Sequence, residues 1–455
     1  MKRKFFGTNG IRGEIGDFFT PVFVSKMSSA IASFMKNKGT MVIGSDSRTS
    51  SPAIKHGTIS SFLSTGIEVL DLGLVPTPLL QFAVTYLKAD FGIMVTASHN
   101  PPHFNGIKVV DADGIEINIQ KQMSIEEIYE KEKFDFVSWE RSKQVTKIDL
   151  TTEYIDQITS FVNVEKIQKR KLTCVVDCGN AVGALTTPLV LKNMGVKVLS
   201  INSNLDGHFP GRGVEPIPEK LKAMGEMVLQ SKADFSIAHD GDADRAIFGD
   251  EKGVIHYGDK SIALFQKWLL QDEQNKKFVT PVSSSRIIED ISEEIGGEII
   301  WTPVGCIYVS RTMIEKESLL GGEENGGIFY SPHQSVRDGS MAAALMADIL
   351  CRTDKTISNL VNELPHYYQK KGRIDCPNEL KGMVMEFIRN NIQEASEILT
   401  IDGIKLIYPD SWVLIRPSGT EPIFRIFVEA KTSIKAEKML EDGLIMIRNA
   451  LKNIN

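Results

Sequence analysis

The sequence of 455 residues is poor in cysteine, has no long hydrophobic run and shows no excess of basic charge. Its five cysteines are an odd number without CxxC spacing, so neither a disulfide framework nor a zinc ribbon is indicated, and a cytoplasmic location is expected. The most apolar stretches, such as residues 341–350, are too short to span a bilayer, and that one carries Asp348. Gly7, Asn9 and Arg12 stand where a signal peptide would need an apolar run. We therefore expect neither secretion nor a membrane partner.

The charge balance argues against a nucleic-acid partner. The formal net charge is −6, whereas affinity for a phosphate backbone depends on concentrated lysine and arginine. An anionic substrate would therefore need local basic residues. Hydrophobic residues make up 42% and charged residues 24%, which excludes the disordered and fibrous classes and is typical of a packed α/β enzyme. No feature of the sequence indicates an oligomeric state.

The length exceeds what one hydrophobic core organises and suggests about three domains, with two to four allowed. Short Val/Ile-rich runs alternate with amphipathic ones over 41–72, and this βαβ pattern recurs over 172–201 and 278–301. The charged stretch 130–147 is interpreted as an exposed helix and connection. The last ninety or so residues, with a helix expected over 379–394, strands over 402–408 and 412–416 and a final amphipathic helix, indicate a smaller α+β domain. The predicted domains are residues 1–148, 149–250, 251–365 and 366–455.

The first motif with chemical content is Thr96-Ala97-Ser98-His99-Asn100-Pro101-Pro102, which follows an apolar strand over 91–95. Open α/β sheets place ligands at the carboxyl ends of their strands, where Ser98 falls. His99 and the loop amides could supply the base and the anion-stabilising groups that a nucleophilic serine needs. The alternative is a polar turn closed by Asn-Pro.

The second motif is Asp240-Gly241-Asp242-Ala243-Asp244-Arg245. Alternate carboxylates on a tight loop converge on a hard cation and leave coordination positions open for a phosphoryl oxygen. An EF-hand loop is opposed by Arg245, which takes the glycine position, and by the strand expected over 246–248. A solvated acidic turn is the remaining alternative, although three clustered carboxylates repel unless something neutralises them. Arg245 could pair with the phosphoryl group or form an ordinary ion pair with a neighbouring aspartate.

Two further turns carry polar groups suited to a sugar phosphate. The glycine-dense segment 321–327 contains Glu323 and Asn325 and permits close approach of the backbone to a ligand, although a simple loop would look the same. Segment 416–422, Arg-Pro-Ser-Gly-Thr-Glu-Pro, offers an arginine, two hydroxyls and loop amides for a phosphate dianion, with a capped turn as the alternative. Arg425 follows shortly after it.

The four motifs together specify a nucleophilic serine, a metal, a sugar-binding turn and a phosphate clamp. In this combination and order the sequence resembles the α-D-phosphohexomutase superfamily over essentially its entire length. The resemblance implies three similar mixed-sheet α/β domains and a smaller C-terminal α+β domain around a central cleft.

The resemblance also implies residue roles. Ser98 would carry the phosphoryl group, and Mg²⁺ would be held by Ser98 with Asp240, Asp242 and Asp244. Arg245 matches the arginine that contacts the phosphoserine, Lys108 the proposed general base, and Arg12 another active-site arginine; His99 is the alternative base. Without the resemblance, Lys108 would be interpreted as an exposed strand lysine. The expected substrate-binding residues are Glu323, Asn325, Arg416, Ser418, Gly419, Thr420 and Arg425.

The sequence departs from the family pattern at two places. The sugar loop of the family usually reads GEMSGH or GEQSGH, so Glu323 matches, whereas Asn325 replaces serine and Gly327 replaces histidine. The GRDxR-like segment appears as Gly44-Ser45-Asp46-Ser47-Arg48, without its first arginine, which leaves Arg48 as a structural or site residue.

The expected activity is reversible phosphoryl transfer between C6 and C1 of glucose or mannose phosphates, through phosphorylated Ser98 and a hexose 1,6-bisphosphate, which also serves as primer. Glucosamine phosphate is the alternative substrate. A metal-dependent phosphatase with a serine nucleophile would use the same residues but would normally need histidine-rich coordination of two metals. A non-catalytic sugar-phosphate sensor is opposed by the intact Ser98 and the complete set of aspartates.

Overall fold

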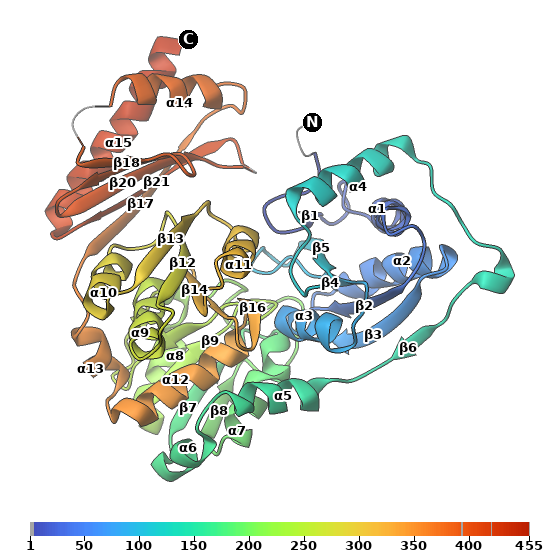
Figure 1. Cartoon of the computed structure of the whole chain (residues 1–455), viewed down its shortest axis with the longest axis horizontal. Helices are drawn as coiled ribbons and strands as arrows, with labels where there is room; N and C mark the ends of the chain where they lie inside the picture. The colour runs from blue at the N-terminus through green and yellow to red at the C-terminus, as the bar shows by residue number, and fades with distance from the viewer. Residues whose placement is uncertain (1–3, 393–394, 420, 455) are drawn as a thin grey trace.

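The computed structural model describes residues 4–392, 395–419 and 421–454. The described strands form four sheets, each with its own helices (Figure 1). The first three sheets are mixed and the fourth is antiparallel, which confirms the predicted fold class of three α/β units and an α+β unit. No described helix is both long and apolar enough to cross a membrane.

The first sheet has the strand order β1 (Ile11–Glu14), β5 (Phe104–Asp111), β4 (Phe91–Val95), β2 (Thr40–Ser45), β3 (Glu68–Leu74) and β6 (Val145–Lys147). Its helices are α1 (Pro21–Phe34), α2 (Ser51–Ser64), α3 (Thr77–Tyr86) and α4 (Ile119–Lys131). The βαβ unit predicted over 41–72 corresponds to β2, α2 and β3. Pro52 at the start of α2 fits the helix because the first turn needs no backbone donor there.

The second sheet has the order β11 (Ile255–His256), β10 (Ile247–Gly249), β9 (Phe235–Ala238), β7 (Thr173–Asp177) and β8 (Lys197–Ile201). Its helices are α5 (Thr151–Ser160), α6 (Val164–Arg170), α7 (Thr187–Asn193) and α8 (Lys222–Ser231). The third sheet has the order β13 (Glu298–Thr302), β12 (Lys277–Pro281), β14 (Leu320–Glu323), β15 (Gly327–Tyr330) and β16 (Gln334–Arg337). It is accompanied by α9 (Gly258–Leu270), α10 (Ile287–Ile295), α11 (Cys306–Glu315), α12 (Gly339–Thr353) and α13 (Ile357–Asn362).

The three mixed sheets repeat one topology. In each, a central strand lies between two parallel neighbours, giving β4-β2-β3, β9-β7-β8 and β14-β12-β13. The first strand of each triplet then turns back into an antiparallel strand, β5, β10 or β15. These three hairpin connections contain the serine motif, the aspartate motif and the glycine-dense motif. Motifs far apart in sequence therefore occupy equivalent positions in three similar units.

The charged stretch 130–147 differs from the sequence prediction. Helix α4 ends at Lys131, and Glu132 takes a left-handed conformation that stops it. The rest contains a short 3-10 turn, Trp139–Arg141, and the edge strand β6, which pairs in parallel with β3. The predicted helix and connection are both present, but the helix covers only residues 130 and 131 of the stretch, and the strand was not predicted. Val145 and Thr146 have β-branched side chains that suit a strand.

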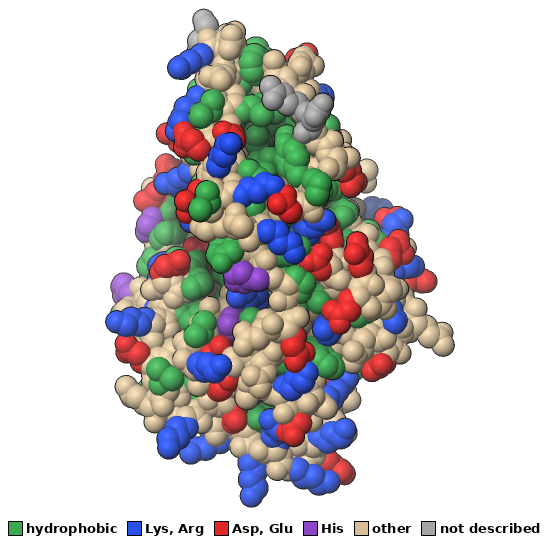
Figure 2. Space-filling model, turned by 90° about the vertical axis from the view of Figure 1, so that its left-hand side faces the viewer, with side chains coloured by type: hydrophobic (Ala, Val, Ile, Leu, Met, Phe, Trp, Pro, Cys, Tyr) green, Lys and Arg blue, Asp and Glu red, His purple; other side chains and the backbone are tan. Residues whose placement is uncertain are grey.

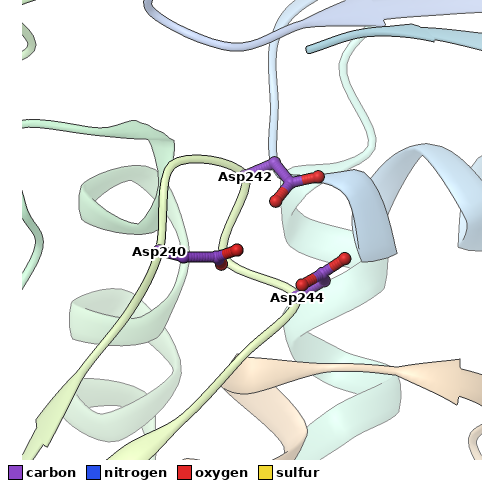
Figure 3. A group of neighbouring side chains, drawn as sticks. All are labelled: Asp240, Asp242 and Asp244. Atoms are coloured by element: carbon purple, nitrogen blue, oxygen red, sulfur yellow. The ribbon is translucent and has the colours of Figure 1, made fainter. Parts of the chain in front are cut away.

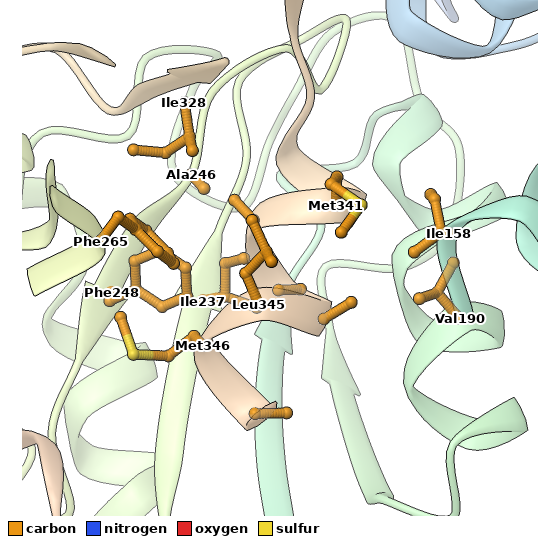
Figure 4. Close-up of a cluster of buried hydrophobic side chains, with 14 of the residues drawn as sticks. Ile158, Val190, Ile237, Ala246, Phe248, Phe265, Ile328, Met341, Leu345 and Met346 are labelled. Carbon is orange, nitrogen blue, oxygen red and sulfur yellow. The ribbon is translucent and has the colours of Figure 1, made fainter. Parts of the chain in front are cut away.

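The most apolar stretch of the sequence forms a core helix. Every residue of α12 from Gly339 to Leu350 is buried. Figure 4 shows Leu345 and Met346 of this helix beside Ile237 and Phe248 of the second sheet. A helix that is apolar all round must be covered on all sides. Helix α12 therefore joins the second and third units around one hydrophobic core.

The fourth sheet has the order β17 (Tyr368–Asp375), β21 (Ile423–Ala430), β20 (Ser411–Pro417), β19 (Ile404–Tyr408) and β18 (Glu397–Leu399). Helices α14 (Lys381–Asn390) and α15 (Ser433–Ile454) accompany it, and Leu440 of α15 packs against Gly372 of β17. Sequence patterns predicted α14, β19, β20 and α15 but not the other strands. Figure 2 shows one face of the molecule, on which lysine and arginine side chains are mixed with aspartate and glutamate.

A buried lysine lies where the fourth unit meets the third. Lys405 is 1% exposed, and its Nζ atom has no hydrogen-bond partner. The Nζ atom is 4.6 Å from the ring centroid of Trp301 and 4.3 Å from that of Trp412. Burial lowers the pKa of Lys405 to about 8, against the opposing effect of nearby carboxylates such as Glu289.

We expect Lys405→Met to stabilise the protein by about 1 to 3 kcal/mol at pH 7, because a buried charge is removed. Between pH 8 and the ordinary lysine pKa of 10.5, the unfolded wild type binds more protons than the folded form. The free energy of unfolding of the wild type should therefore increase relative to that of the variant as the pH rises through this window. Urea unfolding at pH 7 and pH 10 measures both effects, with Lys435→Met as control, because Lys435 is a partly exposed lysine of the same unit that pairs with Asp410. A variant less stable than wild type at pH 7 would show that the tryptophan contacts outweigh the burial cost.

Candidate active site

Ser98 lies in the connection that follows β4. Its side chain is buried, and its backbone has a left-handed φ of 50°, which costs a non-glycine residue about 1 to 2 kcal/mol. The Ser98 amide donates to Thr96 Oγ1 (2.9 Å), and the Ser98 carbonyl accepts from Arg48 Nη2 (2.8 Å). Ser98 Oγ donates to Asp240 Oδ2 (2.8 Å). The strained backbone is thus held so that the hydroxyl faces the aspartate loop.

The aspartate loop brings three buried carboxylates together. Asp240, Asp242 and Asp244 each offer an oxygen, and these oxygens all lie within 4.8 Å of one another. Figure 3 shows the three side chains projecting from a single loop between β9 and β10. A Cβ atom at Gly241 would lie 2.5 Å from the Ser98 carbonyl oxygen, so glycine is needed for the two loops to approach. The strand β10 after the loop removes the EF-hand alternative.

The negative charges of the three carboxylates are only partly neutralised by neighbouring groups. Burial, together with Asp244 and Asp242, raises the pKa of Asp240 to about 7. Burial also opposes ionisation of Asp242, but Lys108 and the Thr77 hydroxyl outweigh it, and the pKa of Asp242 is lowered. One oxygen of Asp242 and one of Asp244 are buried without a hydrogen-bond partner. Clustered hard oxygens with free lone pairs fit a divalent cation such as Mg²⁺.

Lys108 is buried at the centre of the site. Its Nζ atom lies 2.7 Å from Asp242 Oδ2 and 3.1 Å from Asp244 Oδ2. Burial lowers the pKa of Lys108, but Asp242, Asp244 and Glu116 raise it more, so the net pKa is raised. The interpretation as an exposed strand lysine is therefore wrong. Lys108 in this arrangement is an ammonium group that donates to two aspartates.

Arg245 and His99 lie against each other between the serine and aspartate loops. Arg245 Nη2 lies 3.0 Å from His99 Nδ1, and Arg245 Nε lies 3.8 Å from Asp240 Oδ2. The pKa of His99 is lowered, first by the charge of Arg245 and then by burial. His99 is therefore a neutral imidazole whose Nδ1 accepts from the guanidinium.

Arg12 in β1 reaches the serine loop from the other side. Its Nη1 donates to Asn100 Oδ1 (2.8 Å), and its Nε is buried without a partner. Burial lowers the pKa of Arg12, with Asp242 acting in the opposite direction. The structure thus brings Arg12, His99 and Arg245 around Ser98, as a site for a doubly charged phosphoryl group requires.

The glycine-dense turn joins this cluster through a residue that the sequence patterns did not reveal. Glu323, at the end of β14, accepts from Arg337 Nη1 (3.1 Å), and Arg337 Nη2 donates to Asp244 Oδ2 (2.5 Å). Arg337 is 6% exposed. Asn325 is partly buried, and its Oδ1 accepts from the Gly327 amide (3.2 Å) within the turn. Glu323 is therefore tied to the aspartate loop, whereas Asn325 is held within its own turn.

The predicted phosphate clamp is separate from the central cluster. Arg416 Nη2 lies 3.0 Å from Asp402 Oδ2, which also accepts from the Val304 amide (3.1 Å) of the third unit. Arg425 faces Arg416 across β20 and β21 and pairs with Glu421. Among the described residues, these ion pairs of the two arginines lie within the fourth unit and do not reach the serine or aspartate loop.

The other predicted clamp residues lie in the turn between β20 and β21. Ser418 Oγ accepts from the Glu421 amide (3.2 Å), and the Ser418 carbonyl accepts from Lys381 Nζ (2.6 Å). A Cβ atom at Gly419 would meet nothing within 4 Å, so the turn is open there. Thr420 lies outside the described residues.

Four site residues were not identified from the sequence: Asn9, Thr77, Glu116 and Arg337. Thr77 Oγ1 donates to Asp242 Oδ2 (2.6 Å) from the start of α3. The Asn9 amide, oriented to satisfy both neighbours, donates to Glu116 and accepts from Arg337. Thr77 follows β3 and Arg337 ends β16, so proximity to strand ends was the available signal, but none of the four stands in a recognisable motif.

Family models match the chain along most of its length. They are described as phosphoglucomutase/phosphomannomutase, alpha/beta/alpha domains I, II and III, over residues 3–136, 152–253 and 257–368, and the C-terminal domain over residues 372–445. The serine, aspartate, sugar-turn and clamp motifs fall in the four models in turn.

Individual proteins resemble the chain over its full length. A phosphoglucomutase/phosphomannomutase of Thermococcus kodakarensis is 40% identical over 453 residues, covering 99% of each chain. A phosphoglucosamine/phosphogalactosamine mutase of Sulfurisphaera tokodaii is 40% identical over 448 residues, covering 96% of this chain and 98% of the relative. A solved structure of a phosphoglucomutase/phosphomannomutase family protein from Burkholderia thailandensis has a TM-score of 0.87 at 25% identity and covers 97% of both chains.

Proposed function

The chain belongs to the phosphoglucomutase/phosphomannomutase family and is a phosphohexomutase, and from this premise we propose that it moves a phosphoryl group between C6 and C1 of glucose and mannose phosphates by way of Ser98. The observation that carries the proposal is the 2.8 Å bond from the Ser98 hydroxyl to Asp240, within a buried triad of aspartates. A nucleophilic serine beside a cation site is what reversible phosphoryl transfer requires.

The reaction would proceed in two transfers with one intermediate. Phosphorylated Ser98 gives its phosphoryl group to the free hydroxyl of a sugar monophosphate, which forms a hexose 1,6-bisphosphate. The bisphosphate then turns around, and its other phosphate returns to Ser98 as the P–O bond to the sugar breaks. Free hexose 1,6-bisphosphate would prime any enzyme that has lost its phosphoryl group.

Asp240, Asp242 and Asp244, with the phosphoserine, would hold Mg²⁺. The bound cation would supply Lewis-acid stabilisation of charge on the phosphoryl oxygens. Arg245 and Arg12 offer guanidinium groups to the same oxygens, which favours the loose transition state of phosphoryl transfer. Lys108 has a raised pKa and is already protonated, whereas His99 is neutral. Either group would take the hydroxyl proton only at a cost, because Lys108 must first lose a proton and the lowered pKa of His99 makes its imidazole a weak base.

The non-transferring phosphate would be bound by the clamp of the fourth unit, with Arg416, Arg425 and the turn around Ser418 and Gly419. Asp402 orients Arg416 in the absence of substrate. The hexose hydroxyls would be bound by Glu323 and Asn325. Glucosamine 6-phosphate is the second candidate substrate, because a relative as similar as the phosphoglucomutase/phosphomannomutase is named a phosphoglucosamine/phosphogalactosamine mutase. A coupled assay with the three hexose 6-phosphates and a bisphosphate primer distinguishes these substrates.

Arg416→Ala tests the mutase mechanism against a phosphatase. One clamp must hold the bisphosphate in both orientations, so losing a charge-assisted contact of roughly 1.5 to 3 kcal/mol should raise the apparent KM about 10- to 100-fold in both directions. More bisphosphate should also escape into solution. The measurement is the forward and reverse rate together with released bisphosphate and inorganic phosphate.

Arg448→Ala is the control, since Arg448 is an exposed arginine of the same unit that pairs with Glu441. It should leave both KM values unchanged. A loss confined to one direction would refute the shared clamp. Stoichiometric release of inorganic phosphate by the wild type, without isomerised sugar, would refute the mutase mechanism altogether.

A further inference from the structure

Arg337 connects loops from all three mixed-sheet units. Arg337 is the last residue of β16. Its Nη2 donates to Asp244 Oδ2 (2.5 Å) in the second unit, and its Nη1 donates to Glu323 Oε2 (3.1 Å) in the third. The amide oxygen of Asn9, in the first unit, accepts from Arg337 Nη2 at 3.1 Å. A planar guanidinium can make these contacts simultaneously, whereas a lysine ammonium presents a single point charge.

The neighbours of Arg337 hold its backbone in place. Asp338 is the N-cap of α12 and accepts from the Met341 amide (2.9 Å). Its carboxylate also accepts from the Tyr154 hydroxyl (2.7 Å) of α5 and lies 3.0 Å from His333 Nε2. The Gly339 amide donates to the Ala243 carbonyl (3.2 Å) of the aspartate loop. The position of Arg337 is thus fixed relative to both loops that it joins.

Arg337 and the cation would compete for one carboxylate. Asp244 Oδ2 is shared by Arg337 (2.5 Å) and Lys108 (3.1 Å), whereas Asp244 Oδ1 has no hydrogen-bond partner. A guanidinium this close withdraws electron density and negative potential from a metal ligand. The same guanidinium is the ion-pair partner of Glu323 among the described residues. Arg337 would therefore weaken cation binding at Asp244 while it supports the position of Glu323.

We propose that Arg337 is a positioning residue that holds Glu323 in place for the sugar and lowers the affinity of the aspartate loop for its cation. The inference rests on the proposed function, in which Asp244 binds the cation and Glu323 the hexose. Arg337 makes no contact with the reacting atoms in this account. It acts through the two carboxylates and sets the balance between metal and sugar binding.

The test measures two affinities of the dephosphorylated enzyme by calorimetry, one for Mn²⁺ without sugar and one for glucose 6-phosphate without metal. Arg337→Met should bind Mn²⁺ about 5-fold more tightly and glucose 6-phosphate about 10-fold more weakly. Changes of opposite sign in the two affinities distinguish the proposed role, because a purely structural role would weaken both affinities. Arg286→Met is the matched control: Arg286 also joins two units, since its Nη1 donates to the Tyr408 carbonyl (2.9 Å) of the fourth, but it lies outside the aspartate cluster, and both affinities should stay at wild-type values.

Arg337→Lys separates position from charge. Lysine keeps a positive charge near Asp244, so Mn²⁺ affinity should return toward the wild-type value, but it cannot bridge both carboxylates, so sugar affinity should stay low. Recovery of sugar affinity in this variant would overturn the proposal, since charge alone would then suffice.

A double-mutant cycle keeps the test decisive if the methionine variant folds poorly. In a Glu323→Gln background, changing Arg337 to lysine should no longer alter sugar affinity, because the carboxylate that it orients is gone. An undiminished effect in that background would refute positioning through Glu323. If the wild type binds neither Mn²⁺ nor any of the three hexose 6-phosphates, the proposed function itself fails. If the wild type binds both and Arg337→Met shifts both affinities in one direction, only the present inference fails.

Discussion

Replacing Ser98 with alanine should reduce turnover on the order of 10⁴-fold or more, because the phosphoryl group would have no covalent acceptor. The structure predicts that this variant still folds. Alanine accepts the left-handed conformation at about the same cost as serine, and Asp240 keeps a contact to the Arg245 amide at 3.4 Å. Residual activity therefore reports on the mechanism and not on the stability of the protein.

The covalent intermediate can be observed directly. Peptide mapping of purified wild-type enzyme should place phosphate on the peptide that contains Ser98, and glucose 6-phosphate should remove it. Ser236→Ala is a suitable control, since Ser236 is buried in β9 and its Oγ has no hydrogen-bond partner. That variant should keep wild-type turnover. Full activity of Ser98→Ala, or phosphate on a different residue, would exclude Ser98 as the carrier.

The sequence predicted best where a local pattern determines the structure. The aspartate motif follows a strand, and its alternating carboxylates converge wherever a tight loop carries them, so Asp240, Asp242 and Asp244 could be grouped without coordinates. The repeated βαβ pattern likewise predicted three similar α/β units, whereas the mixed sheets were implied by the family resemblance. Both predictions need only residues close together in the chain.

The local pattern was insufficient where the environment is formed by distant residues. Without the family resemblance, Lys108 would have been interpreted as an exposed strand lysine, because its burial depends on Asp242 and Asp244, more than a hundred residues later. Arg337 was missed for the same reason, since its partners are on separate units. The edge strand β6 was not predicted, because its pairing with β3 crosses a long connection. Strand propensity alone is too weak to reveal such pairing.

The family resemblance left open whether Arg48, in the segment 44–48 that lacks the first arginine of the family pattern, is a structural or a site residue. All of its guanidinium donors are used: Nε donates to Asp46 Oδ2 (3.0 Å), and Nη1 and Nη2 donate to four backbone carbonyls. These carbonyls belong to Ser98, Asn100 and Pro101 of the serine loop and to Phe104, with which β5 begins. Asp46 in turn accepts from the Thr96 hydroxyl (2.7 Å). Arg48 is therefore the residue that holds the serine loop to the first sheet.

We expect Arg48→Met to destabilise the protein by about 3 to 5 kcal/mol, since it leaves the Asp46 carboxylate buried without its cation. The four carbonyls would also lose their donors, and a shift of about 1 Å at Ser98 would lower kcat about 100-fold. Chemical denaturation and steady-state kinetics measure the two effects separately. Arg48→Lys should recover part of the stability through its charge but little of the activity, because one ammonium cannot reach all five acceptors.

The two effects of Arg48→Met can be separated by a second substitution. Adding Asp46→Asn removes the uncompensated charge, so the double variant should be more stable than Arg48→Met alone. Its kcat should nevertheless remain low, because the carbonyls of the serine loop are still without their donors. Stability and activity would then respond differently to the same pair of changes. If kcat recovered together with stability, Arg48 would act only by keeping the first unit folded, and the serine loop would hold its shape without it.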